Sequence, residues 1–571
     1  MPTDASPNMV ASFFFIKIDD IRKDLLKYDL YCQTPSGAPK MCTFDTMSED
    51  EVLKLIRTSR ATTSMLDPIP SSFIKDNADI LCPLITRIIN TSFVSSSFPG
   101  RWKSACVKPL LKKKGLELIE SNYRPVSNLS YISKILERAA LFQLEKHTQS
   151  NDLIPVYQSA YRSNHSTETA LLHLHHDILS NMESGRVTAF VGLDLSAAFD
   201  TVHHEVMLDV LSNKFGITED VNSWVGSYLR PREFFVHIDG QSSKAVPIDF
   251  SVPQGSCLGP VLFTYYSSTL ENVVTSRGND LCGYADDHGV YKSLKSGTPE
   301  ETAVRLELEQ CLLSVRDWMN CNRLKMNTKK TEFICFGSSH QLRKLEMSSI
   351  DVCSDIIDRA VHMKYLGCWF DELLSFKFQI SYCIKIAMTN VINIRSIRKY
   401  LSVDSCRTLV RNLVITHIDY ANSLYFGLPQ CELKRLQRVQ NISAKLILGV
   451  SKFSSTTDAF ATLHWVPVVY RIQFKIAVLV FKCLNGSAPK YLVDLLVVQQ
   501  AREGMRSSSQ SASVPLLKIP RHRNKTFLDR SFAYSGPFVW NSLPQEIRSC
   551  CTIDDFKGKL KTYFCGKAYS A

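Results

Sequence analysis

Acidic side chains occur at two places where the surrounding residues are apolar. The run Ala189 to Leu195 carries a single acid, Asp194. A second segment, Leu281 to Tyr291, carries the adjacent acids Asp286 and Asp287 between two apolar arms. A buried carboxylate without a partner is costly, and binding a metal ion is one way to remove that cost. These residues are therefore candidate ligands of hard divalent cations, which prefer oxygen.

Paired divalent ions about 3.5–4 Å apart suit nucleotidyl transfer. One ion lowers the pKa of an attacking hydroxyl, and the other neutralises a triphosphate and its departing pyrophosphate. The elements required are a strand that ends at Asp194 and a hairpin with Asp286 and Asp287 at its tip. Taken singly, a strand-end Asp is more often a cap, and an Asp-Asp pair is more often a solvated turn. The hypothesis therefore depends on the other segments.

Residues 91–371 predict a mixed α+β region. Strand-like apolar runs occupy Ala189 to Leu195, Phe234 to Ile238 and Phe333 to Phe336, and a helical pattern covers Ala198 to Phe215. Residues 1–90 predict short helices, over Asp50 to Ser59 and Ile80 to Phe93. The length of 571 residues exceeds one ordinary domain and predicts two to four packed units.

Residues 372–500 predict mostly helix, with basic and apolar positions interleaved over Leu409 to Ile418 and Leu433 to Leu448. A Ser-rich stretch, Arg506 to Ser513, predicts a linker. The last sixty residues combine aromatic and basic side chains. They include His522, Arg523, Lys525, Phe527, Phe532, Tyr534, Phe538 and Trp540. This composition fits RNA binding by stacking and phosphate contact, and fits a second small core equally well.

Charge and cysteine content narrow the class of protein. The net charge of +12 is spread along the chain, which suits a long polyanion but also a basic soluble enzyme. The 18 cysteines form no C-x-x-C pair, so we expect buried, reduced thiols. The apolar run Val10 to Ile16 is too short for a membrane span, and it is not a secretory signal.

Several segments, in order, resemble the motifs of one polymerase family. Asp194 to Val202 resembles motif A, Val252 to Pro260 resembles motif B, and Tyr284 to Asp287 resembles motif C. Further matching segments are Asn122 to Leu129, Gln158 to Thr169, Trp318 to Glu332 and Tyr365 to Gly367. Together they resemble the reverse transcriptases of non-LTR (LINE-type, jockey-like) retrotransposons over roughly residues 60–371. His464 to Leu484 and Phe532 to Phe564 resemble the C-terminal part of such proteins more loosely.

The resemblance implies a right-hand polymerase fold. Residues 1–90 would be an N-terminal helical extension, 91–371 the fingers and an antiparallel palm sheet, 372–450 a helical thumb, and 451–571 a mostly helical basic region. The implied activity is RNA-directed DNA synthesis with two Mg²⁺ ions, for which Mn²⁺ could substitute. The implied partners are an RNA template, a DNA primer or target and deoxynucleoside triphosphates. A ribonucleoprotein in nucleus and cytoplasm, without a membrane partner, follows from the same resemblance.

The resemblance also implies roles for single residues in motifs A to C. Asp194, Asp286 and Asp287 would be the catalytic carboxylates, with Leu195 as a further metal ligand. Phe199 would be a steric gate against ribose, and Asp200 would turn away from it. For Phe199 alone, a core aromatic at the start of a helix is the favoured interpretation.

Nucleotide and primer contacts are implied for two further sets of residues. Gln254 and Gly255 would lie under the incoming base pair. Lys112, Lys113 and Arg124 would clamp the triphosphate, and Lys330 would be the general acid for pyrophosphate, although Lys329 is its neighbour. The primer end would be gripped by Tyr365, Leu366 and Gly367. His203 and His204 are interpreted as structural or surface residues, because magnesium prefers oxygen.

Three departures from the family pattern weigh on the activity. Full-length elements of this type carry an N-terminal endonuclease, for which residues 1–90 are too few, so we expect a fragment, a truncated copy or a separate reading frame. Thr264 to Ser268 is more polar than the family pattern, and His288 replaces a small polar residue. The alternatives are a catalytically silent remnant that still binds RNA, and a group II intron maturase. The maturase is disfavoured by Asp194 to Val202 and Asn122 to Leu129.

Overall fold

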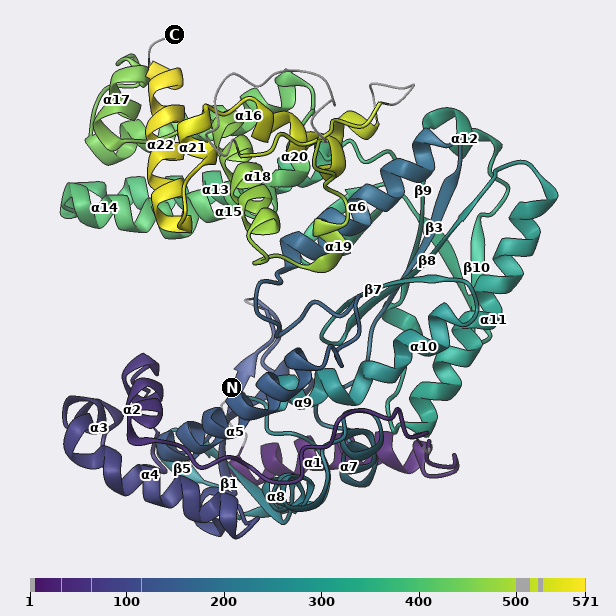
Figure 1. Ribbon diagram of the computed structural model, residues 1–571, viewed down its shortest axis with the longest axis vertical. Helices are drawn as coiled ribbons and strands as arrows, with labels where there is room; N and C mark the ends of the chain where they lie inside the picture. The colour runs from purple at the N-terminus through teal and green to yellow at the C-terminus, as the bar shows by residue number, and fades with distance from the viewer. Residues whose placement is uncertain are drawn as a thin grey trace. The chain divides into compact units, whose positions relative to one another are not determined.

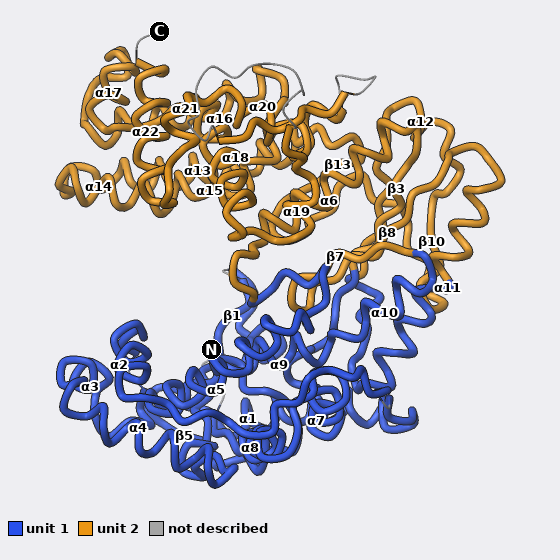
Figure 2. Tube along the Cα trace, in the orientation of Figure 1, with its two compact units in different colours: residues 1–161, 193–278, 310–330 blue, residues 162–192, 279–309, 331–571 orange. Residues whose placement is uncertain are grey.

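The chain passes more than once between two structural units. The computed structural model describes residues 6–31, 33–62, 64–113, 115–499, 514–521 and 527–569. Unit 1 comprises Met1–Tyr161, Leu193–Gly278 and Gln310–Lys330, and unit 2 comprises Arg162–Gly192, Asn279–Glu309 and Thr331–Ala571 (Figure 2). Each unit is described by itself below.

Unit 1 contains a five-stranded sheet in the order β2-β1-β4-β5, with β6 paired to β4. Strand β1 pairs antiparallel with β2 and parallel with β4. Helix α1 (Pro7–Leu25) packs on this sheet, because Val10 and Phe14 share an apolar core with Val107 and Val236. The strands are β1 (Ser104–Leu111), β2 (Tyr123–Asn128), β4 (Arg232–Ile238), β5 (Gln241–Ser242) and β6 (Val246–Ile248).

The helices of unit 1 follow the periodicity of the sequence. Helix α2 begins at a capping box, in which the Ser48 side chain and Glu51 exchange hydrogen bonds, and it buries Val52 and Ile56. The helices predicted over Asp50 to Ser59 and Ile80 to Phe93 are confirmed as α2 and α4. The helices are α2 (Glu49–Thr58), α3 (Ser71–Asp76), α4 (Ala78–Val94), α5 (Tyr131–Ser150), α7 (His204–Asn213), α8 (Glu219–Leu229), α9 (Gly259–Tyr266) and α10 (Leu270–Thr275).

The helix predicted from Ala198 is wrong at its start, because α7 begins at His204. Ala197 has a positive φ of 54°, and its carbonyl accepts hydrogen bonds from the amides of Asp200 and Thr201. The Phe199 carbonyl accepts from the Val252 amide at 3.0 Å instead of an amide of a helix. The segment is therefore a turn fixed by a tertiary hydrogen bond, which periodicity does not reveal.

Unit 2 contains a six-stranded sheet in the order β10-β11-β9-β3-β8-β7. Helix α6 (Thr167–Glu183) covers it, with Leu174 and Ile178 in one core with Phe190 and Ile334 (Figure 1). The strands are β3 (Val187–Leu193), β7 (Asp280–Tyr284), β8 (Asp287–Leu294), β9 (Glu332–Phe336), β10 (Ser349–Val352) and β11 (Asp355–Ala360). Unit 2 also contains a hairpin of β12 (His362–Tyr365) and β13 (Cys368–Asp371) and the helix α12 (Ser339–Lys344). A further helix, α11 (Pro299–Cys321), begins in unit 2 and continues into unit 1.

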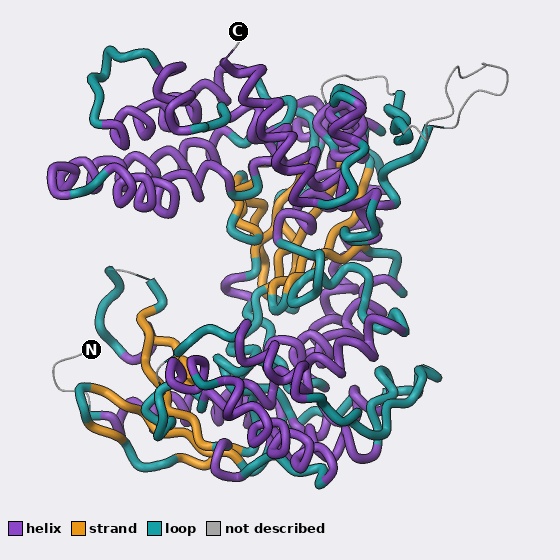
Figure 3. The backbone as a smooth tube through the Cα atoms, turned by 60° about the vertical axis from the view of Figure 1, so that its left-hand side comes forward, coloured by secondary structure: helices purple, strands orange, loops and turns teal. Residues whose placement is uncertain are grey.

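From residue 377 onward the described chain is almost entirely helical, as predicted for residues 372–500 (Figure 3). A single apolar core joins these helices, and Phe532 and Trp540 are buried in it. His522, Arg523, Lys525 and the segment Arg506 to Ser513 lie outside the described residues. The helices are α13 (Lys377–Ile397), α14 (Val403–Val410), α15 (Thr416–Asp419), α16 (Gln430–Leu448), α17 (Thr456–Leu463), α18 (Val468–Leu484), α19 (Lys490–Val493), α20 (Phe532–Asn541), α21 (Gln545–Arg548) and α22 (Ile553–Tyr569).

These observations confirm the α+β class. No helix within the described ranges combines the length and the apolar character needed to cross a lipid bilayer.

Candidate active site

Asp194 follows the last residue of β3, in unit 1. Its carboxylate accepts a hydrogen bond from the Asn327 side chain at 3.1 Å, and the Lys330 Nζ atom lies 3.4 Å from the same oxygen. The Asp194 side chain retains 34% of its exposure. The carboxylate is therefore paired with a cation and remains partly open to solvent.

A backbone bridge holds the residues around Asp194. The Asn327 amide donates to the Asp194 carbonyl at 2.9 Å, and the Ser196 amide donates to the Lys325 carbonyl at 2.9 Å. Leu195 lies between these two bonds, opposite Met326. The carbonyl of Leu195 is used by neither bond, so the bridge leaves it available as a ligand.

The predicted hairpin with two acids at its tip is present in unit 2. Strands β7 and β8 pair antiparallel, with Tyr284 opposite Asp287, so that Ala285 and Asp286 form the turn. Ala285 has a positive φ of 58°. Asp286 is half-buried and Asp287 is exposed, whereas most residues of the two arms are buried. Burial of the arms therefore positions two carboxylates at the solvent boundary.

His288, which departs from the family pattern, points into unit 2. Its side chain is buried, and its Nδ1 atom lies 3.2 Å from the Asp286 carbonyl in a hydrogen bond. Burial lowers the pKa of His288 to about 4, so the ring is neutral at physiological pH. A neutral imidazole that bonds to the turn supports the hairpin without adding a charge beside the carboxylates.

Phe190 fixes the contact between β3 and its neighbour β8. A Cβ atom placed on Gly289 would lie 2.2 Å from the Phe190 Cζ atom, so only glycine leaves room for the ring. The Phe190 ring also stacks on Tyr291, with 6.1 Å between centroids. Phe190 precedes Asp194 by four residues and Gly289 follows Asp287 by two. Sequence reasoning missed this pair, although a glycine inside a strand is a recognised sign of close approach.

The predicted primer-grip residues form the turn between β12 and β13. Leu366 and Gly367 have φ values of 44° and 80°, the two positive values typical of a type I′ turn. The Tyr365 hydroxyl donates to the Cys282 carbonyl at 2.7 Å and so ties this hairpin to β7. The Leu366 carbonyl accepts from the Tyr420 hydroxyl. Tyr365 therefore supports the strand that leads to the acidic turn.

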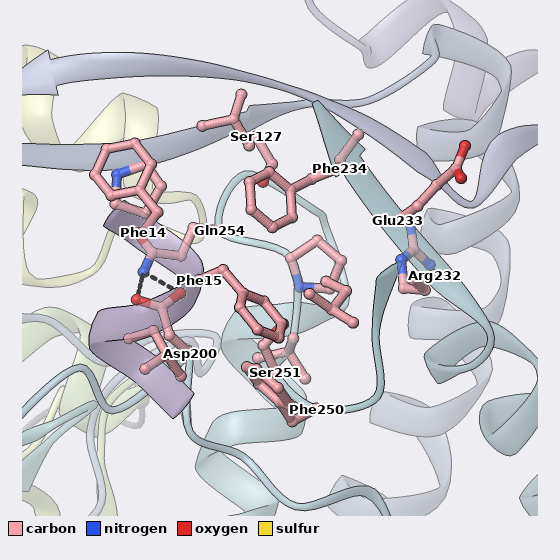
Figure 4. Close-up of a pocket in the computed structure, with 17 residues that line it drawn as sticks. Phe14, Phe15, Ser127, Asp200, Arg232, Glu233, Phe234, Phe250, Ser251 and Gln254 are labelled. Carbon is pink, nitrogen blue, oxygen red and sulfur yellow. Dashed lines mark hydrogen bonds between the residues drawn. The ribbon is translucent and has the colours of Figure 1, made fainter. Parts of the chain in front are cut away.

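Motifs A and B are joined inside unit 1 (Figure 4). The Gln254 Nε2 atom lies 2.7 Å from each Asp200 carboxylate oxygen and donates to them. The Gln254 carbonyl accepts from the Ser127 amide at 2.8 Å. Gly255 has a φ of 120°, and a Cβ atom there would lie 2.3 Å from the Ser127 carbonyl oxygen. The expected need for glycine at this position is therefore explained by close backbone approach.

Asp200, expected to turn away from the gate residue, points at the Gln254 amide. Its carboxylate lines an apolar cavity of about 70 Å³ together with Phe14 of α1 (Figure 4). Burial raises the pKa of Asp200 to about 6, although the hydrogen bond from Gln254 and the charge of Lys17 act in the opposite direction.

Phe199 is half-buried, and its ring stacks on Phe263 with 4.7 Å between centroids. One face of the ring therefore packs against α9. The polar residues that follow motif B are also accommodated by hydrogen bonds. The Tyr266 hydroxyl donates to the Asn322 carbonyl, and the hydroxyls of Thr148 and Tyr265 lie 3.1 Å apart.

The basic residues predicted to hold phosphate differ in the contacts that their side chains make. Lys112 donates from Nζ to the Ser121 carbonyl at 2.7 Å, so it stabilises its own loop. Burial, and the nearby charges of Lys17, Lys330 and Arg124, lower the pKa of Lys112. The side chains of Lys113 and Arg124 are exposed and form no hydrogen bond or ion pair with the described residues. Unit 1 therefore presents a group of cations near the lysine that contacts Asp194.

The residues available for metal binding come from both units. Asp194 belongs to unit 1, and Asp286 and Asp287 belong to unit 2. In the described part of the chain, no three His, Cys, Asp or Glu side chains are already gathered as a ligand group. His204 is buried and bonded to the Ser251 carbonyl at 2.9 Å through Nε2, so it serves the packing of α7. The donor atoms of Asp194, Asp286 and Asp287 and the Leu195 carbonyl are all oxygen, which fits Mg²⁺.

Comparison with known proteins identifies the class of this region. Residues 111–370 match the family described as reverse transcriptase (RNA-dependent DNA polymerase).

The similar proteins come from mobile elements. The RNA-directed DNA polymerase from mobile element jockey of Drosophila melanogaster is 26% identical over 407 residues, which cover 69% of this chain and 43% of that protein. The probable RNA-directed DNA polymerase from transposon X-element of the same species is 25% identical over 457 residues, 78% of this chain and 47% of that protein. A third, from transposon BS of that species, is 29% identical over 299 residues, 51% of this chain and 32% of that protein.

The predicted resemblance to non-LTR retrotransposon polymerases is thereby confirmed. The chain spans less than half the length of these relatives.

Proposed function

We propose that the chain catalyses RNA-directed DNA synthesis, adding deoxynucleotides to a primer 3′-hydroxyl on an RNA template. The observation that carries this proposal is the acidic β7–β8 turn, on a strand adjacent to the one that ends before Asp194. It occurs within a reverse transcriptase domain whose relatives are named RNA-directed DNA polymerases. The natural setting would be a ribonucleoprotein with a DNA primer or target, in nucleus and cytoplasm.

Asp194, Asp286 and Asp287 would hold two Mg²⁺ ions, with the Leu195 carbonyl as a further ligand and Mn²⁺ able to substitute. These ions would activate the primer hydroxyl and neutralise the triphosphate. The support is chemical and topological, because the donors are oxygen atoms and β3 and β8 are neighbours in one sheet. Lys330 keeps the Asp194 carboxylate neutralised at 3.4 Å when no cation is bound.

Lys330 would then donate a proton to the departing pyrophosphate. Its Nζ atom already lies beside a catalytic carboxylate, whereas the exposed Lys329 makes no hydrogen bond or ion pair with the described residues. This difference favours Lys330 over its neighbour as the general acid.

The incoming nucleotide would be bound by residues of unit 1. Arg124 and Lys113 are free to contact the triphosphate, and Lys112 would act mainly by holding the β1–β2 loop. Gln254 and Gly255 would lie under the base pair, and Phe199 would reject ribonucleotides. In unit 2, Tyr365, Leu366 and Gly367 would position the primer end.

Primer extension tests the proposed function. The purified chain is incubated with poly(rA)·oligo(dT), dTTP and Mg²⁺, and the Asp286→Asn variant is the matched control. Extension by the wild type but not by the variant supports the proposal. Absence of extension by the wild type, with binding of the template–primer retained, would instead support the silent remnant that only binds RNA.

A further inference from the structure

A basic cleft lies among the helices of unit 2, away from any residue to which the proposed function gives a role. Its volume is about 540 Å³. The side chains that line it include five cations and no acid. The lining residues are Arg395, Arg398, Arg438, Asn441, Ile442, Lys445, Leu446, Gly449, Val450, Lys452 and Thr456.

Helical spacing brings these cations together. Arg395 and Arg398 are one turn apart on and just after α13, and Arg438 and Lys445 are two turns apart on α16. The α16 helix ends at Gly449, whose φ of 68° turns the chain so that Lys452 reaches the same cleft. Two helix faces and one turn thus direct positive charge to one place.

Some cations of this cleft make hydrogen bonds that stabilise the fold, and others make none with their side chains. Arg398 donates to the carbonyls of Leu446, Ile447 and Leu401, each at 2.8 Å, and so caps the end of α16. In contrast, the side chains of Arg395 and Arg438 form no hydrogen bond or ion pair with the described residues. Because no acidic side chain lines the cleft, the positive charge is left for an external anion.

Two exposed aromatic rings follow lining cations closely in the sequence, Tyr400 two residues after Arg398 and Phe453 one residue after Lys452. Tyr400 is 77% exposed and Phe453 is 85% exposed. Lys399 lies over the Tyr400 ring and Lys452 lies over the Phe453 ring, each 4.8 Å from the centroid. Aromatic rings interleaved with cations are typical of surfaces that bind unpaired bases.

We propose that this cleft, together with Tyr400 and Phe453, which are near lining cations in the sequence, binds single-stranded nucleic acid. Phosphates of the strand contact Arg395, Arg438 and Lys452, and bases stack on the two rings. That the natural strand is RNA rests on the proposed function, whereas the existence of the site does not. Among the C-terminal aromatic residues, for which stacking on RNA and a second small core were equally reasonable, Phe532 and Trp540 are buried and Phe538 is exposed.

Fluorescence anisotropy with labelled oligonucleotides of about 12 nucleotides tests this site. The probes are oligouridylate and oligothymidylate, and the variants are Arg395→Gln/Arg438→Gln and Tyr400→Ala/Phe453→Ala. The control is Lys557→Gln/Lys561→Gln, which removes two exposed charges on α22 outside the cleft. All altered side chains are exposed, so the fold is expected to persist, and circular dichroism of each variant checks it.

The two cleft variants are expected to differ in character. Affinity falls as salt rises, so a plot of log affinity against log salt concentration has a negative slope. Loss of two phosphate contacts should make this slope shallower by roughly 1.4, at about 0.7 per contact. Loss of the rings should weaken binding at least about fivefold with little change in that slope. Similar effects on both probes indicate a site for either strand, and a stronger effect on oligouridylate indicates RNA. Binding by the cleft variants equal to that of the wild type, or an equal loss in the control, would refute the site.

Primer extension on a short pre-annealed duplex separates this inference from the proposed function. If the wild type extends the primer and the cleft variants bind oligonucleotides normally, the site is refuted while the polymerase stands. If the wild type fails to extend but the cleft variants lose binding, the polymerase is refuted while the site stands.

Discussion

Lys330 combines a structural and a chemical role at a single side chain. Beside Asp194 it neutralises a carboxylate, and during synthesis it is proposed to protonate the leaving group. Lys330→Gln should lower kcat by about 10²–10³ with little change in KM for the nucleotide, because general acids contribute on this scale. Single-turnover extension with dTTP measures the effect. Lys329→Gln is the matched control, and an equal loss in both variants would show that only local charge matters.

Asp200 gives stability a dependence on pH. Its pKa of about 6 in the folded protein lies above the value of about 3.9 for an unfolded chain, so between these values the folded state binds more protons. The contribution of Asp200 to the free energy of unfolding is therefore greatest below pH 4. It decreases as the pH rises to 6, by no more than about 3 kcal/mol.

The Asp200→Asn variant should remove this pH dependence. Asparagine keeps an acceptor for Gln254 but carries no charge, so the variant should gain stability relative to the wild type at pH 7.5 and gain little at pH 4.5. Urea unfolding of both proteins at the two pH values measures the difference. A stability difference that is the same at both values would show that Asp200 is ionised at little cost in the folded protein.

At the scale of elements, a single close approach connects the motif B loop to strand β2. Gly255→Ala should destabilise the protein by about 3 kcal/mol or more, because a Cβ atom would lie 2.3 Å from the Ser127 carbonyl oxygen at a φ of 120°. Gly240 also has a positive φ, 82°, but has no atom within 4 Å of its Cβ position. Gly240→Ala should therefore cost only about 1 kcal/mol. Chemical denaturation compares the two, and equal costs would contradict the steric argument.

Elements with a strong apolar pattern could be predicted from the sequence. Helices α2 and α16 and strands β3 and β9 follow buried positions at helical or strand spacing, and the Asp286–Asp287 turn follows from its apolar arms. The start of α7 could not be predicted, because Phe199 and Val252 are joined by a hydrogen bond between segments distant in sequence. Tertiary contacts of this kind have no local signal.

In the candidate site too, some features are evident from the local sequence, and others depend on residues that are distant in the sequence. The acidic residues and the glycine of motif B were evident from residue type and spacing. The pairing of Asp200 with Gln254, and of Phe190 with Gly289, was not, because each pair joins residues more than fifty positions apart. The basic cleft was also missed, since its charges come from separate helices and were counted only as interleaved basic positions.

At the scale of the molecule, the proposed metal ligands belong to two different units. Segments of each unit alternate along the sequence, and Asp194 is reached two residues after the chain leaves the sheet segment of unit 2. The proposed polymerase therefore requires metal ions to be held by Asp194 together with the Asp286–Asp287 turn.

Manganese binding tests this requirement most directly. Mn²⁺ is titrated, with electron paramagnetic resonance of the free ion, into protein bearing template, a dideoxy-terminated primer and matching dNTP, after subtraction of the signal with dNTP alone. Asp194→Asn and Asp286→Asn should each lose at least one of two ions, or bind about tenfold more weakly, with template–primer binding unchanged. Asp280→Asn, at the opposite end of the same hairpin, should bind both ions. Two ions bound with wild-type affinity by Asp194→Asn would contradict the shared metal site.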